Sequence, residues 1–174
     1  MNISKKELEE IIKLIVKQIS EKKKINFIFS KPWNNKYYIA LDVLKRFKLN
    51  ANAVISKDLE ESYRDIVKNY CDWKDIIDLD EDNIDLISQN DTFFLDIKMK
   101  NITNIIMFNE DELESALVMK LFEMGKEVYL WKETVKNVTG KEPENYIKKL
   151  LSYYDEILSY GIKIVDIEEV KIYE

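Results

Sequence analysis

Apolar residues occur in two kinds of segment along the chain. Short runs rich in β-branched and aromatic residues predict strands at Ile25–Phe29, Asn52–Ser56, Asp91–Ile97, Glu127–Trp131 and Ile162–Ile167, and a short strand around Ile76 and Ile77 within Trp73–Leu79. Longer segments with apolar residues three and four positions apart predict helices at Tyr38–Phe47, Leu59–Tyr70, Asp111–Met124 and Glu144–Tyr160. Alternating strands and helices predict a three-layer α/β fold, with a mostly parallel sheet of five or six strands covered on both faces.

The first 24 residues have a different pattern. Residues 5–19 predict an amphipathic helix whose apolar stripe consists of Leu8, Ile11, Ile12, Ile15 and Ile19. The polar segment 20–24 follows, with three consecutive lysines, and reads as a basic tether. We therefore divide the chain into residues 1–24, a helix and tether, and residues 25–174, the α/β domain. The stripe either docks on this domain or binds a partner, since an isolated helix of this length is marginal in water.

Composition narrows the classes of function. The net charge of −6 argues against a nucleic-acid partner, which requires a basic face. No apolar run reaches the roughly 18 residues of a membrane span, and the charged N-terminus is unlike a secretory signal. The single cysteine, Cys71, cannot form an intramolecular disulfide, so we expect a cytoplasmic protein. The chain has no histidine, which removes the commonest general acid or base and the commonest metal ligand. We therefore expect no metal site.

Ligand-binding residues are expected where strands end. The strand–helix order is that of Rossmann/flavodoxin-like folds, in which ligands bind at the carboxyl edge of the sheet. The candidate residues there are Ser30, Trp33, Asn34, Asp96 and Asn101. The loop 30–36 has no glycine, and so has neither the Rossmann nor the P-loop spacing. A turn with a surface tryptophan is the alternative interpretation of this loop.

Two blocks carry a family resemblance. The stretch Phe29–Phe47, FSKPWNNKYYIALDVLKRF, resembles the opening of the flavoprotein superfamily of flavin-containing cysteine decarboxylases and flavin prenyltransferases. The matching helix positions are Tyr38, Ala40, Leu41, Asp42, Leu44 and Arg46. The block Asp91–Leu130 is similar to the family's flavin loop, closing helix and strand, with Asn101 as the loop's counterpart.

The resemblance implies an FMN-binding fold, but two of the family's features are missing. The phosphate-loop glycine would fall near Trp33, and the catalytic histidine has no counterpart. We therefore interpret the chain as a degenerate member with no cofactor expected and at most weak FMN binding, and we lean against an enzyme. The helix at residues 5–19 resembles the encapsulation peptides of bacterial microcompartment enzymes.

Together these features predict an accessory, non-catalytic flavoprotein-like protein of an ethanolamine or propanediol utilisation microcompartment. It would bind a small ligand or a partner, and the expected partners are further copies of itself and shell or cargo proteins. The alternatives are an active FMN-binding enzyme or flavin carrier, and a ligand-free oligomeric scaffold.

Overall fold

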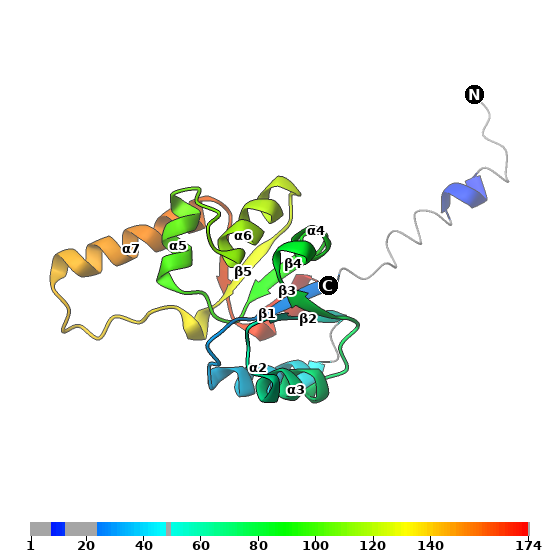
Figure 1. The fold of residues 1–174 in the computed structure, drawn as a ribbon. Coiled ribbons are helices and arrows are strands. Elements are labelled where there is room, and N and C mark those ends of the chain that lie inside the picture. The colour runs from blue at the N-terminus through cyan, green and yellow to red at the C-terminus, as the bar shows by residue number, and fades with distance from the viewer. Residues whose placement is uncertain (1–7, 13–23, 48–49, 174) are drawn as a thin grey trace, which may run out of the picture.

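A computed structural model of the chain describes residues 8–12, 24–47 and 50–173 (Figure 1). Six strands form one sheet: β1 (Ile25–Phe29), β2 (Ala51–Ser56), β3 (Ile76–Leu79), β4 (Asp91–Phe94), β5 (Val128–Trp131) and β6 (Lys163–Val165). Their spatial order is β3-β2-β1-β4-β5-β6, and every neighbouring pair is parallel. The predicted three-layer α/β architecture is therefore confirmed.

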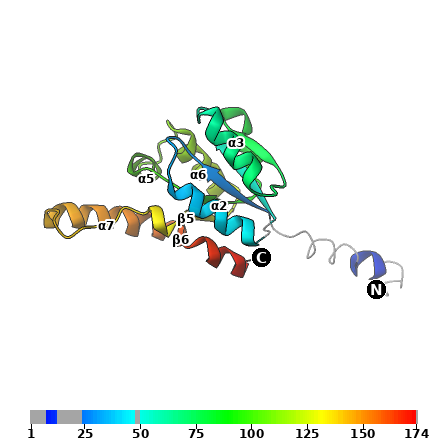
Figure 2. The ribbon, with the colours of Figure 1, turned by 90° about the horizontal axis from the view of Figure 1, so that it is seen from below.

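Helices cover both faces of the sheet (Figures 1 and 2). One face is covered by α2 (Lys36–Phe47), α3 (Glu61–Tyr70) and the 3₁₀ segment η3 (Ile167–Tyr173). The other is covered by α4 (Ile84–Ile87), α5 (Met99–Ile106), α6 (Leu113–Glu123) and α7 (Glu144–Ser159). Successive strand side chains point to opposite faces, so Phe27 and Phe29 enter the first core while Ile28 enters the second. Two short 3₁₀ segments, η1 (Glu81–Asn83) and η2 (Lys132–Thr134), follow β3 and β5.

The segment after β4 differs from the prediction. The sequence predicts a strand that continues to Ile97, but β4 ends at Phe94 and α5 begins at Met99. Burial of Ile102 and Ile105, one helical turn apart, stabilises this short helix. The short helix α4 was likewise not predicted, because four residues contain too little periodicity to identify a helix.

The N-terminal stripe is described only in part. Residues 8–12 are helical, and Leu8, Ile11 and Ile12 expose 50%, 42% and 50% of their surface. Ile15 and Ile19 lie outside the described residues. Among the described residues, no helix combines the length and apolar character that crossing a membrane requires.

Candidate functional site

The strand order changes direction between β1 and β4, so the carboxyl ends of these two strands form the switch point where open α/β sheets bind ligands. Ser30 follows β1 directly, and Asp96 lies two residues after β4. Parallel pairing of β1 with β4 brings both positions to the same edge, although 66 residues separate them in sequence.

Tyr37 fixes the start of the β1–α2 loop. Its hydroxyl accepts a hydrogen bond from the Ser30 amide at 3.2 Å and donates one to the Ser30 carbonyl at 3.1 Å. Burial, reinforced by the negative charge of Asp96, raises the pKa of Tyr37 above its ordinary value, so this hydroxyl stays protonated. The Ser30 hydroxyl is also buried, but it has no hydrogen-bond partner among the described residues.

Asn34 connects the two loops across the switch point. Its side-chain amide donates to the Asp96 carboxylate at 3.0 Å, and its side-chain oxygen accepts from the Lys36 amide at 3.0 Å. The Tyr37 and Tyr38 amides donate to the carbonyls of Asn34 and Asn35. The first amides of α2 are thus satisfied within the loop itself, whereas an anion site at a helix start requires these donors to be open.

Trp33 faces α3. Its ring stacks on Tyr63 with centroids 4.5 Å apart and an interplanar angle of 4°. It also makes edge contacts with Tyr37 and Tyr38. The indole N–H is buried without a partner among the described residues. The Trp33 ring is therefore partly buried and packs on three tyrosines of its own chain.

Two lysines of the loop are engaged by neighbouring elements. Lys31 pairs with Asp58 of the β2–α3 loop at 2.6 Å, which raises the pKa of Lys31 and lowers that of Asp58 through their hydrogen bond and opposite charges. Lys36 donates to the backbone carbonyl of Glu133, which follows β5. Lys31 and Lys36 thus connect the β1–α2 loop to the β2–α3 loop and to the segment that follows β5.

Asn101 lies in the first turn of α5, at the same edge, and is almost fully buried. No side chain caps the start of this helix, where Lys98 occupies the N-cap position. The structure therefore brings Asn34 and Asp96 into contact, positions Ser30 beside Tyr37, and turns Trp33 towards α3.

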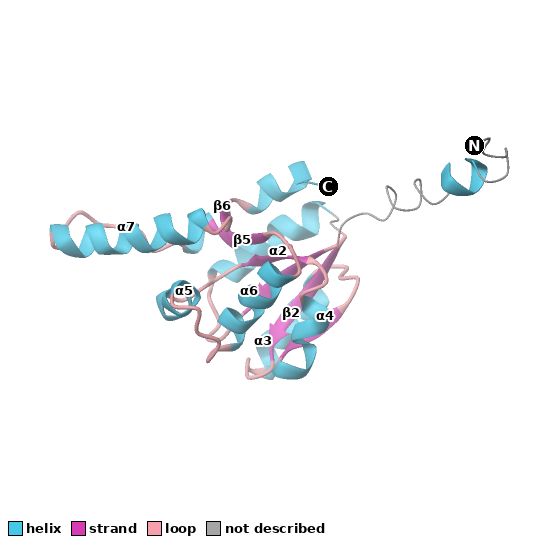
Figure 3. Cartoon of the chain, turned by 90° about the horizontal axis from the view of Figure 1, so that it is seen from above, coloured by secondary structure: helices cyan, strands magenta, loops and turns pink. Residues whose placement is uncertain are grey.

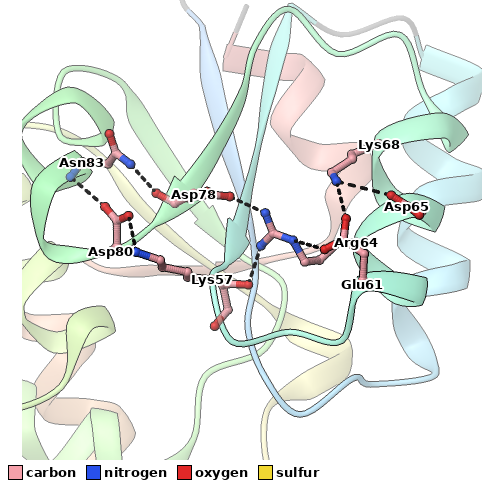
Figure 4. A network of polar contacts seen from close by, with 9 residues as sticks. Lys57, Glu61, Arg64, Asp65, Lys68, Asp78, Asp80 and Asn83 are labelled. Carbon is pink, nitrogen blue, oxygen red and sulfur yellow. Dashed lines mark hydrogen bonds and ion pairs between the residues drawn. The ribbon is translucent and has the colours of Figure 1, made fainter.

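A second polar network follows β2 and β3 (Figure 4). The Arg64 guanidinium donates to the Ser56 carbonyl at 2.9 Å and to the Asp78 carboxylate at 2.5 Å, and lies 3.5 Å from Glu61. The Asn83 side-chain amide donates to the Asp78 backbone carbonyl, and the Asn83 backbone amide donates to the Asp80 carboxylate. Lys57 forms an ion pair with Asp80 at 3.8 Å. Sequence reasoning did not identify this network. The available signal was that Arg64 is one of only two arginines in a lysine-rich chain.

Two further features concern possible metal ligands and the Cys71 thiol. Among the described residues, no group of three or more histidine, cysteine, aspartate or glutamate side chains is arranged to hold a metal ion. Burial raises the pKa of the Cys71 thiol to about 11, so it is protonated at neutral pH, and it lies 3.5 Å from the Leu41 carbonyl.

Comparison with known proteins supports the fold. No family model matches the chain, and no curated protein matches its sequence. Among solved structures, the phenylacrylic acid decarboxylase from Aquifex aeolicus is similar, with a TM-score of 0.53 over 83% of this chain and 81% of that one. The two sequences are 15% identical, so this likeness concerns the fold alone. It agrees with the Rossmann-like, parallel α/β architecture that the sequence predicted.

Proposed function

We propose that this chain is an accessory flavoprotein-like protein that binds a small polar ligand at the β1/β4 switch point and performs no catalysis of its own. The observation that carries the ligand site is the buried Ser30 hydroxyl, which lacks a partner among the described residues. An unpaired buried polar group costs about 1–3 kcal/mol. A ligand that hydrogen-bonds this hydroxyl would recover that free energy.

Two observations support the non-catalytic part of the proposal. Tyr37 is buried and its pKa is raised, and its hydroxyl is hydrogen-bonded to both the amide and the carbonyl of Ser30. The Cys71 thiol, with its pKa near 11, is a poor nucleophile at neutral pH. Neither group is tuned for proton transfer or nucleophilic attack near pH 7.

The same loop disfavours a phosphate. The Lys36, Tyr37 and Tyr38 amides are already hydrogen-bonded, and the Asp96 carboxylate held by Asn34 would repel an anion. The proposed ligand is therefore neutral or cationic, and FMN binds weakly or not at all. The alternative is an active FMN-binding enzyme or flavin carrier, and the fold shared with a decarboxylase is the observation that favours it.

Isothermal titration with four probes tests the ligand site: FMN, inorganic phosphate, ethanolamine and 1,2-propanediol. We expect ethanolamine or 1,2-propanediol to bind, with a loss of about ten-fold or more in the Ser30→Ala variant, equivalent to about 1.4 kcal/mol. The exposed Ser152→Ala variant is the control, since Ser152 lies on α7. A yellow purified protein absorbing near 450 nm, or sub-micromolar FMN affinity, would instead establish the flavin alternative.

We further propose that the apolar stripe of the N-terminal helix targets the protein to an ethanolamine or propanediol utilisation microcompartment. The exposure of Leu8, Ile11 and Ile12 supports a surface that binds a partner. Deletion of residues 1–19 should leave the melting temperature unchanged and abolish co-localisation with shell proteins. A large loss of stability would mean that the stripe packs on the α/β domain.

A further inference from the structure

The helix α7 presents an apolar flank to solvent. It has 16 residues, and its N-terminal half extends beyond the other helices and strands of the domain (Figures 1–3). Leu150, Tyr154 and Ile157 bury one face against the second core. On the adjoining flank, Leu151 is 50% exposed and Leu158 is 44% exposed.

The spacing of this flank is that of a helix–helix interface. Ile147, Leu151, Tyr154 and Leu158 are separated by four, three and four residues, the repeat that lines the seam of a coiled coil. Tyr154 already packs within its own chain, where its hydroxyl contacts Met99. Leu151 and Leu158 therefore provide the available part of the seam.

Two charges lie beside Leu151 on the same flank. Lys148 precedes it by three residues and Asp155 follows it by four, so both neighbour it on the helix surface. Lys148 pairs with Glu144 at 2.6 Å. Asp155 is exposed and has no ion pair with any of the described residues.

We propose that a second copy of this chain packs antiparallel along this flank of α7. The two-fold axis passes between residues 151 and 152, which is the midpoint of Glu144–Ser159. In that register Lys148 opposes Asp155 of the partner subunit, and the reverse pair forms on the other side of the axis. The two Leu151 side chains meet near the axis. A parallel arrangement in register would instead bring like charges to the same level, so the charges select the antiparallel one.

The size of the contact predicts a weak dimer. A helix of 16 residues is about 24 Å long. Pairing over one such helix gives a contact at the small end of specific interfaces, where about 1,600 Å² is the standard size. We therefore expect reversible association that depends on protein concentration. This inference is independent of the proposed ligand site.

Sedimentation equilibrium of the full chain over a concentration series tests the proposal. Leu151→Glu should weaken association at least ten-fold, and Leu158→Glu should weaken it by a smaller factor. Leu86→Glu is the control, because Leu86 is similarly exposed but lies on α4. Unfolding curves of the variants establish that they remain folded. A wild-type protein that stays monomeric throughout the series, or a dimer that Leu151→Glu leaves intact, would overturn the proposal.

Charge exchange tests the antiparallel register. Lys148→Asp and Asp155→Lys should each weaken self-association, since like charges then face each other across the interface. An equimolar mixture of the two variants should associate, and the double variant should recover the wild-type affinity. If the single exchanges leave the affinity unchanged, the antiparallel assignment is wrong.

Discussion

At the carboxyl ends of β2 and β3, the charged side chains are paired with one another. Arg64 donates hydrogen bonds to the Ser56 carbonyl and the Asp78 carboxylate. The Asp80 carboxylate accepts a hydrogen bond from the Asn83 amide and forms an ion pair with Lys57 (Figure 4). At the carboxyl ends of β1 and β4, a carboxylate is bound by a neutral amide and the Ser30 hydroxyl is buried without a partner among the described residues. Both regions belong to one edge of one sheet.

The difference separates polar groups that stabilise the fold from those available to a ligand. In a hydrogen-bonded ion pair, each polar group has a partner. Removing one residue of the network therefore leaves its partners unpaired, which lowers stability. A buried group that already lacks a partner contributes no such bond, and its removal relieves a desolvation cost. Three substitutions and one titration test this distinction.

Arg64→Ala should produce the largest loss of stability, about 2–3 kcal/mol, because Ser56 and Asp78 lose hydrogen bonds to a charged donor. Arg64→Lys should recover part of it, since an ammonium cannot reproduce the forked geometry of the guanidinium. Urea unfolding measures both. Arg46→Ala is the control, because Arg46 is exposed on α2 and should change stability by less than about 0.5 kcal/mol. Equal effects at the two arginines would contradict a structural role for the network.

Tyr37→Phe should destabilise the domain by about 1–2 kcal/mol, because the Ser30 amide and carbonyl both lose their bond to the hydroxyl. Tyr70→Phe is the comparison variant, since the Tyr70 hydroxyl bonds Asp42 at the surface. We expect the Tyr70 variant to fall within about 0.5 kcal/mol of the wild type in the same urea titration.

Ser30→Ala should leave stability unchanged or raise it by up to about 1 kcal/mol, while ligand binding falls, because no internal hydrogen bond of the hydroxyl is lost. Ser88→Ala should instead lower the stability of the domain, by about 1 kcal/mol. The Ser88 side chain is also buried, but its hydroxyl donates to the Asp85 carbonyl at 3.0 Å. A comparable destabilisation at both serines would show that the Ser30 hydroxyl is internally paired.

The smallest effect concerns the exposed pair of Lys31 and Asp58. The folded-state pKa of Asp58 is lowered, chiefly by its hydrogen bond to Lys31. The pair's contribution is therefore present above the ordinary carboxyl value of 3.8 and is lost as the pH falls through the folded-state pKa. An NMR titration of the Asp58 carboxyl should give a pKa below 3.8 that rises towards the ordinary value in Lys31→Ala. Added salt should reduce the shift, because the pair is in solvent.

Strands and long helices were predictable because hydrophobic periodicity is a local property. The strand Ile25–Phe29 was predicted at its exact bounds, and Glu144–Tyr160 to within one residue of α7. The positive φ of Gly125, at 63°, is the backbone conformation expected of a residue that ends a helix. The helices α4 and α5 were missed because segments of four and eight residues are too short for a periodic signal.

By itself, the sequence determined the alternation of strands and helices, the class of fold and the loops at which its strands end. Only the tertiary structure decided which of those loops meet. Asn34 and Asp96 are 62 residues apart, and their contact follows from β1 lying between β2 and β4. Lys31 likewise reaches Asp58 because β1 and β2 are neighbours. The order of strands depends on the packing of all the helices against the whole sheet, and no local pattern of residues records it.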